Sequence, residues 1–104
     1  YTQLYPHELS PAEREQAVQN REMAVRLTWK PYMHDPRLPA LLARVTAPTR
    51  IVWGRQDKII PVECGTLYQQ AVPGADLVVL EQCGHAPHLE KPDAFVRLAL
   101  DFLR

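Results

Sequence analysis

The sequence predicts an α/β fold with two short parallel strands in a β-α-β-α unit, preceded by helices. Residues 51–53 and 77–80 are short, continuous apolar runs bounded by Gly and Pro, which is typical of parallel strands buried on both faces. Residues 61–72, between the two runs, are compatible with a helix that ends at Pro73 and Gly74. A strand, a helix and a second strand in this order form a right-handed crossover whose strands are parallel.

The N-terminal part of the chain predicts a helix that starts at residue 10. Ser10 can cap it, Pro11 fits the first helical position, and Glu13 lies three residues after the cap, as in a capping box. Pro31 should end the helix, because proline disfavours helical geometry in the residue before it. An apolar stripe along the helix is expected to pack on another element, and its members are Ala17, Met23, Ala24 and Leu27.

Three prolines in residues 31–39 then predict a linker. Residues 39–45 favour a short helix, which Pro48 ends. Near the C-terminus, Pro92 predicts the start of a last helix. Its apolar residues recur at helical spacing, and they are Phe95, Val96, Ala99, Leu100 and Leu103.

Composition indicates one globular domain at most and argues against several classes of partner. The formal net charge is zero, with 12 basic and 12 acidic residues, so no overall field attracts nucleic acid or an anionic membrane. No apolar stretch reaches the roughly 18 residues that span a bilayer, and the N-terminus lacks the pattern of a signal peptide. Cys64 and Cys83 are too few for a disulfide framework, so we expect free thiols and a cytoplasmic location.

Asp57 and His85 follow the two predicted strands, at the carboxyl edge where parallel sheets gather reactive groups. If the strands are neighbours, we expect the carboxylate and the imidazole to lie within hydrogen-bonding distance. Such a carboxylate fixes the imidazole tautomer and stabilises the imidazolium, while the other ring nitrogen takes a proton from a nucleophile. Gly54 and Gly84 suit tight turns and close backbone approach beside this pair. Ordinary turn and loop roles are the alternatives for Asp57 and His85.

Two motifs carry a resemblance to a known family. One is a G-x-x-D turn and the other a G-H-x-P-x-x-E-x-P segment, and their residues are Gly54, Asp57, Gly84, His85, Pro87, Glu90 and Pro92. With a β-α-β unit between the motifs and a helix after them, residues 48–104 resemble the C-terminal part of the α/β-hydrolase fold. The resemblance implies that Asp57 is the acid and His85 the base of a catalytic triad.

Residues 1–47 are similar to the end of the helical cap that many of these enzymes insert above the active site. The chain is therefore expected to divide into a cap-like segment, residues 1–47, and a C-terminal β-α-β-α portion, residues 48–104. Trp29, Tyr32 and Met33 would then line a substrate pocket. Ordinary packing is the alternative for this aromatic cluster.

The nucleophile of such a triad is absent from the sequence. Ser10 is the only serine, it precedes Pro11, and neither a G-x-S-x-G elbow nor a glycine-rich oxyanion loop is present. Because the chain begins with Tyr1, we expect a processed or truncated product. The resemblance implies the C-terminal part of a serine-type hydrolase that cleaves an ester or a carbon–carbon bond of a small-molecule substrate. A non-catalytic truncated module, folded as an oligomer or a binding domain, is the alternative, and a complete enzyme would need an unconventional nucleophile.

No cofactor and no metal are expected. Cys64, Cys83, His85 and His88 are of types that bind zinc, yet their spacing matches no common site. Cys83 lies two residues from His85 in one loop, so it is not expected to be the nucleophile, and His88 is interpreted as structural. We expect self-association, because a two-stranded sheet leaves a bare strand edge and apolar faces.

Overall fold

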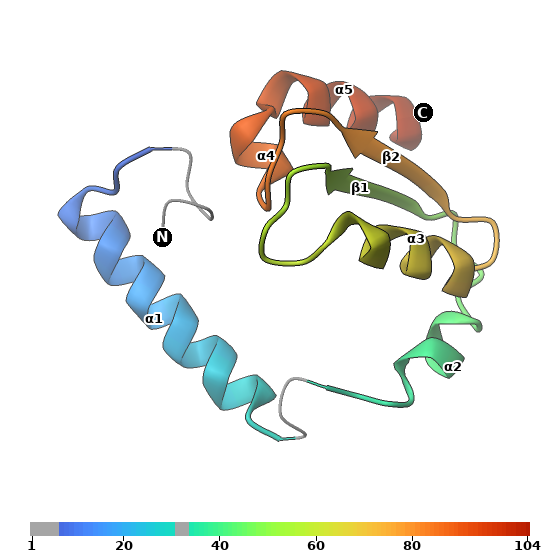
Figure 1. Ribbon diagram of the computed structural model, residues 1–104, viewed down its shortest axis with the longest axis horizontal. Helices are drawn as coiled ribbons and strands as arrows, with labels where there is room; N and C mark the ends of the chain where they lie inside the picture. Colours follow the sequence, from blue (N-terminus) through green and yellow to red (C-terminus); the bar gives the residue numbers. More distant parts are fainter. Residues whose placement is uncertain (1–6, 31–33) are drawn as a thin grey trace.

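The computed structural model describes residues 7–30 and 34–104, and Figure 1 shows the arrangement of its helices and strands. In chain order the elements are α1 (Pro11–Thr28), α2 (Leu38–Leu42), β1 (Arg50–Gly54), α3 (Val62–Ala71), β2 (Asp76–Leu80), α4 (Pro87–Glu90) and α5 (Pro92–Leu103). The predicted order of helices and strands is confirmed. The short helix α4 was not predicted.

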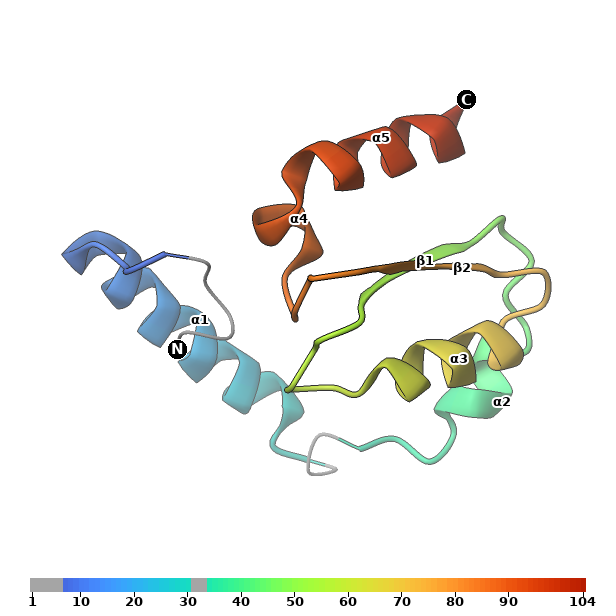
Figure 2. The ribbon, with the colours of Figure 1, turned by 45° about the horizontal axis from the view of Figure 1, so that its top comes forward.

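Strands β1 and β2 form a parallel two-stranded sheet, as the sequence predicts. Their register pairs Arg50 with Asp76 at one end and Gly54 with Leu80 at the other. Figure 2 shows α5 on one face of this sheet and α3 on the other. Both strands end at the same edge, so the loops that follow Gly54 and Leu80 leave the sheet side by side.

Specific contacts fix α3 and α5 to the sheet. Gly65 of α3 is buried, and a Cβ atom built there would lie 3.2 Å from the Trp53 ring, so the absence of a side chain lets α3 approach β1 closely. On the opposite face, the Arg50 guanidinium binds Asp76 (Nε to Oδ2, 2.8 Å) and Asp101 of α5 (Nη1 to Oδ2, 3.1 Å). Arg50 thereby joins β1, β2 and α5 at the edge where the strands begin.

The sheet is less buried than the apolar runs predict. Most strand residues are half-buried, so the expectation of strands buried on both faces is wrong for this chain. The reason is that one helix per face covers only part of the sheet, and no strand among the described residues pairs with the outer edge of β1. In the described part of the chain the buried apolar residues are Leu9, Ala17, Val72, Cys83 and Ala86. Cys83 and Ala86 belong to the loop of His85, which is therefore well packed.

Helix α1 begins with the capping box that the sequence predicts. The Ser10 N–H donates to Oε2 of Glu13 (2.8 Å), and the Glu13 N–H donates to Oγ of Ser10 (3.4 Å). The helix ends at Thr28, shortly before the proline that was expected to stop it.

Helix α1 lies apart from the sheet in both views (Figures 1 and 2). Of its apolar stripe, Ala17 is buried, whereas Met23 is 56% and Leu27 is 75% exposed. The expectation that the whole stripe packs on another element is therefore wrong for the described residues. None of the helices in residues 7–30 and 34–104 combines the length and the apolar content that crossing a membrane requires.

Candidate active site

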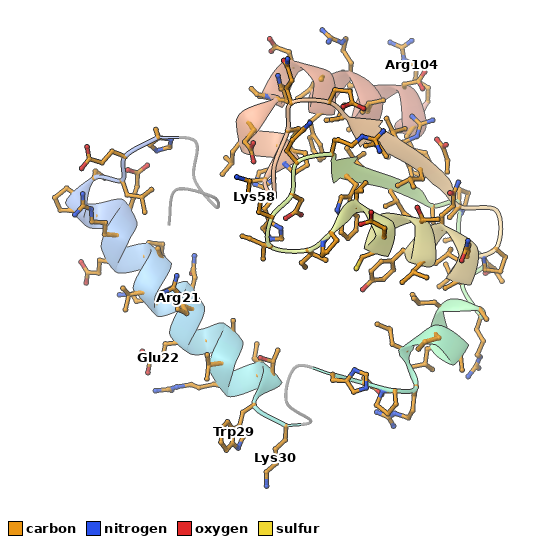
Figure 3. The ribbon with its side chains drawn as sticks, viewed as in Figure 1. Arg21, Glu22, Trp29, Lys30, Lys58 and Arg104 are labelled. Carbon is orange, nitrogen blue, oxygen red and sulfur yellow. The ribbon has the colours of Figure 1, made fainter. Side chains whose placement is uncertain are left out.

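Asp57 and His85 meet at the carboxyl edge of the sheet. Asp57 lies in the loop after β1, which Lys58 marks in Figure 3, and His85 lies in the loop after β2. Oδ2 of Asp57 is 2.9 Å from Nδ1 of His85. The aspartate side chain is 5% exposed and the histidine side chain 29%. The predicted hydrogen bond between the two residues is confirmed, and it reflects the parallel pairing of the strands.

The second carboxylate oxygen of Asp57 is held by its own loop. Oδ1 accepts hydrogen bonds from the N–H groups of Ile59 (2.8 Å) and Ile60 (3.0 Å). The indole N–H of Trp53 donates to the Ile60 carbonyl (3.2 Å), which ties this loop back to β1. Burial raises the pKa of Asp57, but the hydrogen bonds from Ile60, His85 and Ile59 outweigh it and hold the pKa below its usual range. The carboxylate is therefore ionised at neutral pH.

Close backbone contact joins the acid loop to the histidine loop. Gly54 is buried, and a Cβ atom there would collide with the Gly84 carbonyl oxygen and lie 2.5 Å from that of Cys83. The Gln56 N–H donates to the Cys83 carbonyl (2.9 Å), and the Cys83 N–H donates to Oε1 of Gln56 (3.1 Å). Close approach at Gly54 is confirmed. Gln56 was missed, because a glutamine in a loop carries no signal of such a bridge.

A carboxylate also holds the histidine loop. Oε2 of Glu90 accepts from the Gly84 N–H (2.7 Å), and Oε1 accepts from the Ala86 N–H (3.0 Å). These two N–H groups lie on either side of His85 in the chain. Glu90 belongs to the predicted histidine segment, but the sequence alone does not indicate this role.

A small cavity of about 150 Å³ lies beside the pair. Its lining residues are Val52, Trp53, Gly54, Asp57, Ile60, His85 and Pro87. Ligand pockets usually enclose about 300–1,000 Å³. The cavity that the described residues form beside the pair is therefore smaller than an ordinary ligand pocket.

No described side chain is placed as a nucleophile for His85. Ser10 caps α1, where its Oγ accepts the Glu13 N–H. Cys83 is 1% exposed, and burial raises the pKa of its thiol, so its reactive thiolate form is disfavoured. The His88 ring packs edge-on against Phe95, at 6.1 Å between ring centroids. Among the described residues, no group of three or more His, Cys, Asp or Glu side chains could hold a metal ion.

Of the three residues predicted to line a substrate pocket, only Trp29 is among the described residues, and it lies away from this site. Trp29 follows the end of α1, is 61% exposed, and points away from the β-α-β unit in Figure 3. Tyr32 and Met33 lie outside the described residues. A pocket that includes these three residues stays a prediction.

Known proteins are similar to this chain in sequence and in fold. A sequence model of the alpha/beta hydrolase family matches residues 2–98. The 2-hydroxy-6-oxononadienedioate/2-hydroxy-6-oxononatrienedioate hydrolase 2 of Pseudomonas putida is 41% identical over 69 residues, which cover 66% of this chain and 24% of that protein. The chain thus matches about a quarter of the length of this relative.

Two solved structures are also similar. The 2-hydroxy-6-oxo-6-phenylhexa-2,4-dienoate hydrolase of Rhodococcus sp. strain RHA1 aligns with a TM-score of 0.61 and 31% identity, over 70% of this chain and 28% of that one. A lipase candidate from Acinetobacter baumannii AYE aligns with a TM-score of 0.73 and 33% identity, over 86% of this chain and 30% of that one. The family model, together with the paired acid and histidine loops, leads to one conclusion: the chain belongs to the alpha/beta hydrolase family.

Proposed function

We propose that this chain supplies the general base, His85, and its orienting acid, Asp57, to a hydrolase whose nucleophile lies outside these 104 residues. The observation that carries the proposal is the 2.9 Å hydrogen bond between Nδ1 of His85 and Oδ2 of Asp57. An ionised Asp57 keeps the proton on Nδ1, so Nε2 has a lone pair for proton abstraction. The imidazolium that then forms is stabilised by Asp57, and it returns the proton from Nε2 to the leaving group.

The similar proteins suggest a substrate class. The Rhodococcus and Pseudomonas hydrolases act, by their names, on 2-hydroxy-6-oxo-dienoates or related dioates. Such a compound contains a ketone and no ester, so its hydrolysis breaks a carbon–carbon bond next to the carbonyl group. We therefore favour carbon–carbon bond hydrolysis of a small oxo-acid. Ester hydrolysis is the neighbouring possibility, which the likeness to the lipase candidate supports.

The exposed apolar surface supports a missing partner segment. Leu100 is 54% and Leu103 is 77% exposed on α5, and Met23 is 56% exposed on α1. A second cavity, of about 240 Å³, opens between β1 and α5. Exposed apolar surface of this kind marks a place where another polypeptide packs. We propose that the nucleophile-bearing part of the hydrolase covers it.

The same surface favours a second candidate function, a non-catalytic module that self-associates. In that case a second copy of the chain covers β1, α1 and α5, most simply with two-fold symmetry. We also propose a reducing compartment such as the cytoplasm, because Cys64 and Cys83 are both free thiols.

A chimera tests the catalytic proposal. This chain would replace the segment that it matches in the Pseudomonas putida hydrolase, and hydrolysis of that enzyme's own substrate and of a short activated ester would be measured. We expect hydrolysis that falls at least about a hundredfold in His85→Ala, since the general base contributes about 10²–10⁴-fold. His88→Ala is the matched control. This nearby histidine packs on Phe95, so its substitution should leave hydrolysis unchanged. A folded chimera without His85-dependent hydrolysis would contradict the proposal.

A further inference from the structure

We propose that Glu90 is a positioning residue for His85, acting through the backbone on both sides of the imidazole. Its carboxylate accepts the N–H of Gly84 (Oε2, 2.7 Å) and the N–H of Ala86 (Oε1, 3.0 Å). The inference rests on the proposed function, in which His85 is the base. It adds a second carboxylic residue to the site, one that sets the direction of the ring without receiving a proton.

The short helix α4 aims the Glu90 carboxylate at this loop. The Glu90 N–H donates to the Ala86 carbonyl (2.9 Å), while the Ala86 N–H donates to the Glu90 carboxylate. Two hydrogen bonds of opposite direction therefore join Glu90 to Ala86. Pro87 begins the helix directly after Ala86, at a position where proline fits. Glu90 is thus held by its own backbone before its side chain binds the loop.

Gly84 makes room for the carboxylate. A Cβ atom at Gly84 would lie 3.0 Å from Oε1 and 3.1 Å from Oε2 of Glu90, which is closer than ordinary van der Waals contact. With both neighbours of His85 fixed to one carboxylate, the histidine backbone has little freedom left. The imidazole then reaches Asp57 by side-chain rotation alone, and the ordering of the loop does not have to be repeated for each turnover.

A carboxylate suits this task better than an amide. Two N–H donors converge on Glu90, and an ionised carboxylate offers two acceptor oxygens, whereas glutamine offers one oxygen and one NH2 group that would face a donor. Hydrogen bonds to an ionised acceptor are also about twice as strong as neutral ones. Glu90→Gln is therefore a nearly isosteric change that should release one side of His85.

The Nδ1–H proton of His85 gives a direct readout in the 104-residue chain. Nitrogen-15 NMR would detect this proton, with His85→Gln to assign it. In Glu90→Gln we expect its exchange with water to be about tenfold faster, because losing one charge-assisted hydrogen bond raises the population of the open loop by roughly that factor. Backbone amides of β1 and β2 should exchange at wild-type rates, which separates a local effect from general loss of stability. Glu63→Gln, at an exposed glutamate in the first turn of α3, is the matched control.

Wild-type exchange of the Nδ1–H proton in a folded Glu90→Gln chain would overturn the proposal, as would equal acceleration in Glu63→Gln. If the NMR spectrum of Glu90→Gln shows that this variant is unfolded, the exchange of the Nδ1–H proton would be measured in Glu90→Asp instead. Aspartate keeps the charge but is one methylene shorter, so it should leave one N–H unbound and also speed the exchange. This measurement does not depend on enzyme activity. A chimera without hydrolysis would therefore contradict the proposed function, whereas the role of Glu90 would still be decided by the exchange rate of the Nδ1–H proton.

Discussion

The contact between the two loops makes Gly54 the most sensitive position near the candidate pair. In Gly54→Ala the new Cβ atom would collide with the Gly84 carbonyl oxygen and lie 2.5 Å from the Cys83 oxygen and 2.8 Å from the Cys83 carbonyl carbon. All three atoms belong to the backbone, so no side-chain rotation can relieve the collision. The loops must move apart, and the hydrogen bond between Asp57 and His85 should lengthen or break.

The expected loss of stability in Gly54→Ala follows from the contacts that are broken when the two loops move apart. Overpacking of a well-packed site costs about 1–3 kcal/mol. Moving the loops apart also strains the two hydrogen bonds between Gln56 and Cys83, one between backbone groups and one to the Gln56 side chain, each worth about 0.5–1.5 kcal/mol. We therefore expect the free energy of unfolding to fall by about 3 kcal/mol. In a chain of this size that is a large share of the total stability.

Urea denaturation followed by tryptophan fluorescence would measure this loss, and the Nδ1–H signal of His85 would report on the pair. Gly74→Ala is the matched control. Gly74 has a φ of 70° and nothing within 4 Å of a built Cβ atom, so alanine there costs about 1 kcal/mol of backbone strain without touching the site. The reasoning is refuted if Gly54→Ala is no less stable than Gly74→Ala and keeps the Nδ1–H signal.

Three further predictions concern acid stability, activity and assembly. The pKa of Asp57 lies below its usual range, so its ionised form stabilises the fold above the ordinary pKa of about 3.9 and this stability is lost as the pH falls through the folded pKa. Urea titrations should therefore give a smaller loss of stability on acidification for Asp57→Asn than for the wild type, and an equal loss would count against the assigned hydrogen bonds. The chain alone should hydrolyse a short activated ester no faster than His85→Ala does, because its sequence contains neither a G-x-S-x-G elbow nor a glycine-rich oxyanion loop. A hundredfold difference, about 2.7 kcal/mol, would reveal a nucleophile that was missed. Light scattering over a concentration series should show self-association, and a monodisperse species of 11.9 kDa at high micromolar concentration would contradict it.

The strands and the pair between their loops could be predicted because their signals are local. Apolar runs bounded by Gly and Pro fix the strands, and a parallel crossover brings the ends of both strands to one edge. Asp57 and His85 then meet as a consequence of the topology, at 2.9 Å. The pattern of hydrophobic residues could not predict how deeply the strands are buried, since burial depends on how much polypeptide covers the sheet.

The supporting residues could not be predicted for a different reason. Gln56 and Glu90 act through hydrogen bonds to backbone N–H groups, and any polar side chain at the right point in space could make such bonds. Helix α4 has four residues, too few to show a helical period in the sequence. Most of the apolar stripe of α1 is exposed among the described residues, because an amphipathic pattern predicts that a face will pack but not what it packs against.

The contacts that hold the pair in place all lie within one stretch of the chain. The carboxylate of Asp57 is fixed by Ile59 and Ile60, and Trp53 ties their loop to β1. Gln56 and Glu90 hold the loop of His85, so these supporting residues lie between positions 53 and 90. The proposed base and its acid can therefore be ordered by contacts within this chain. The cavity beside them is different, since at about 150 Å³ it needs further walls to hold a substrate. Under the proposed function, the groups for proton transfer are held locally, whereas substrate binding and nucleophilic attack would depend on polypeptide that covers β1, α1 and α5.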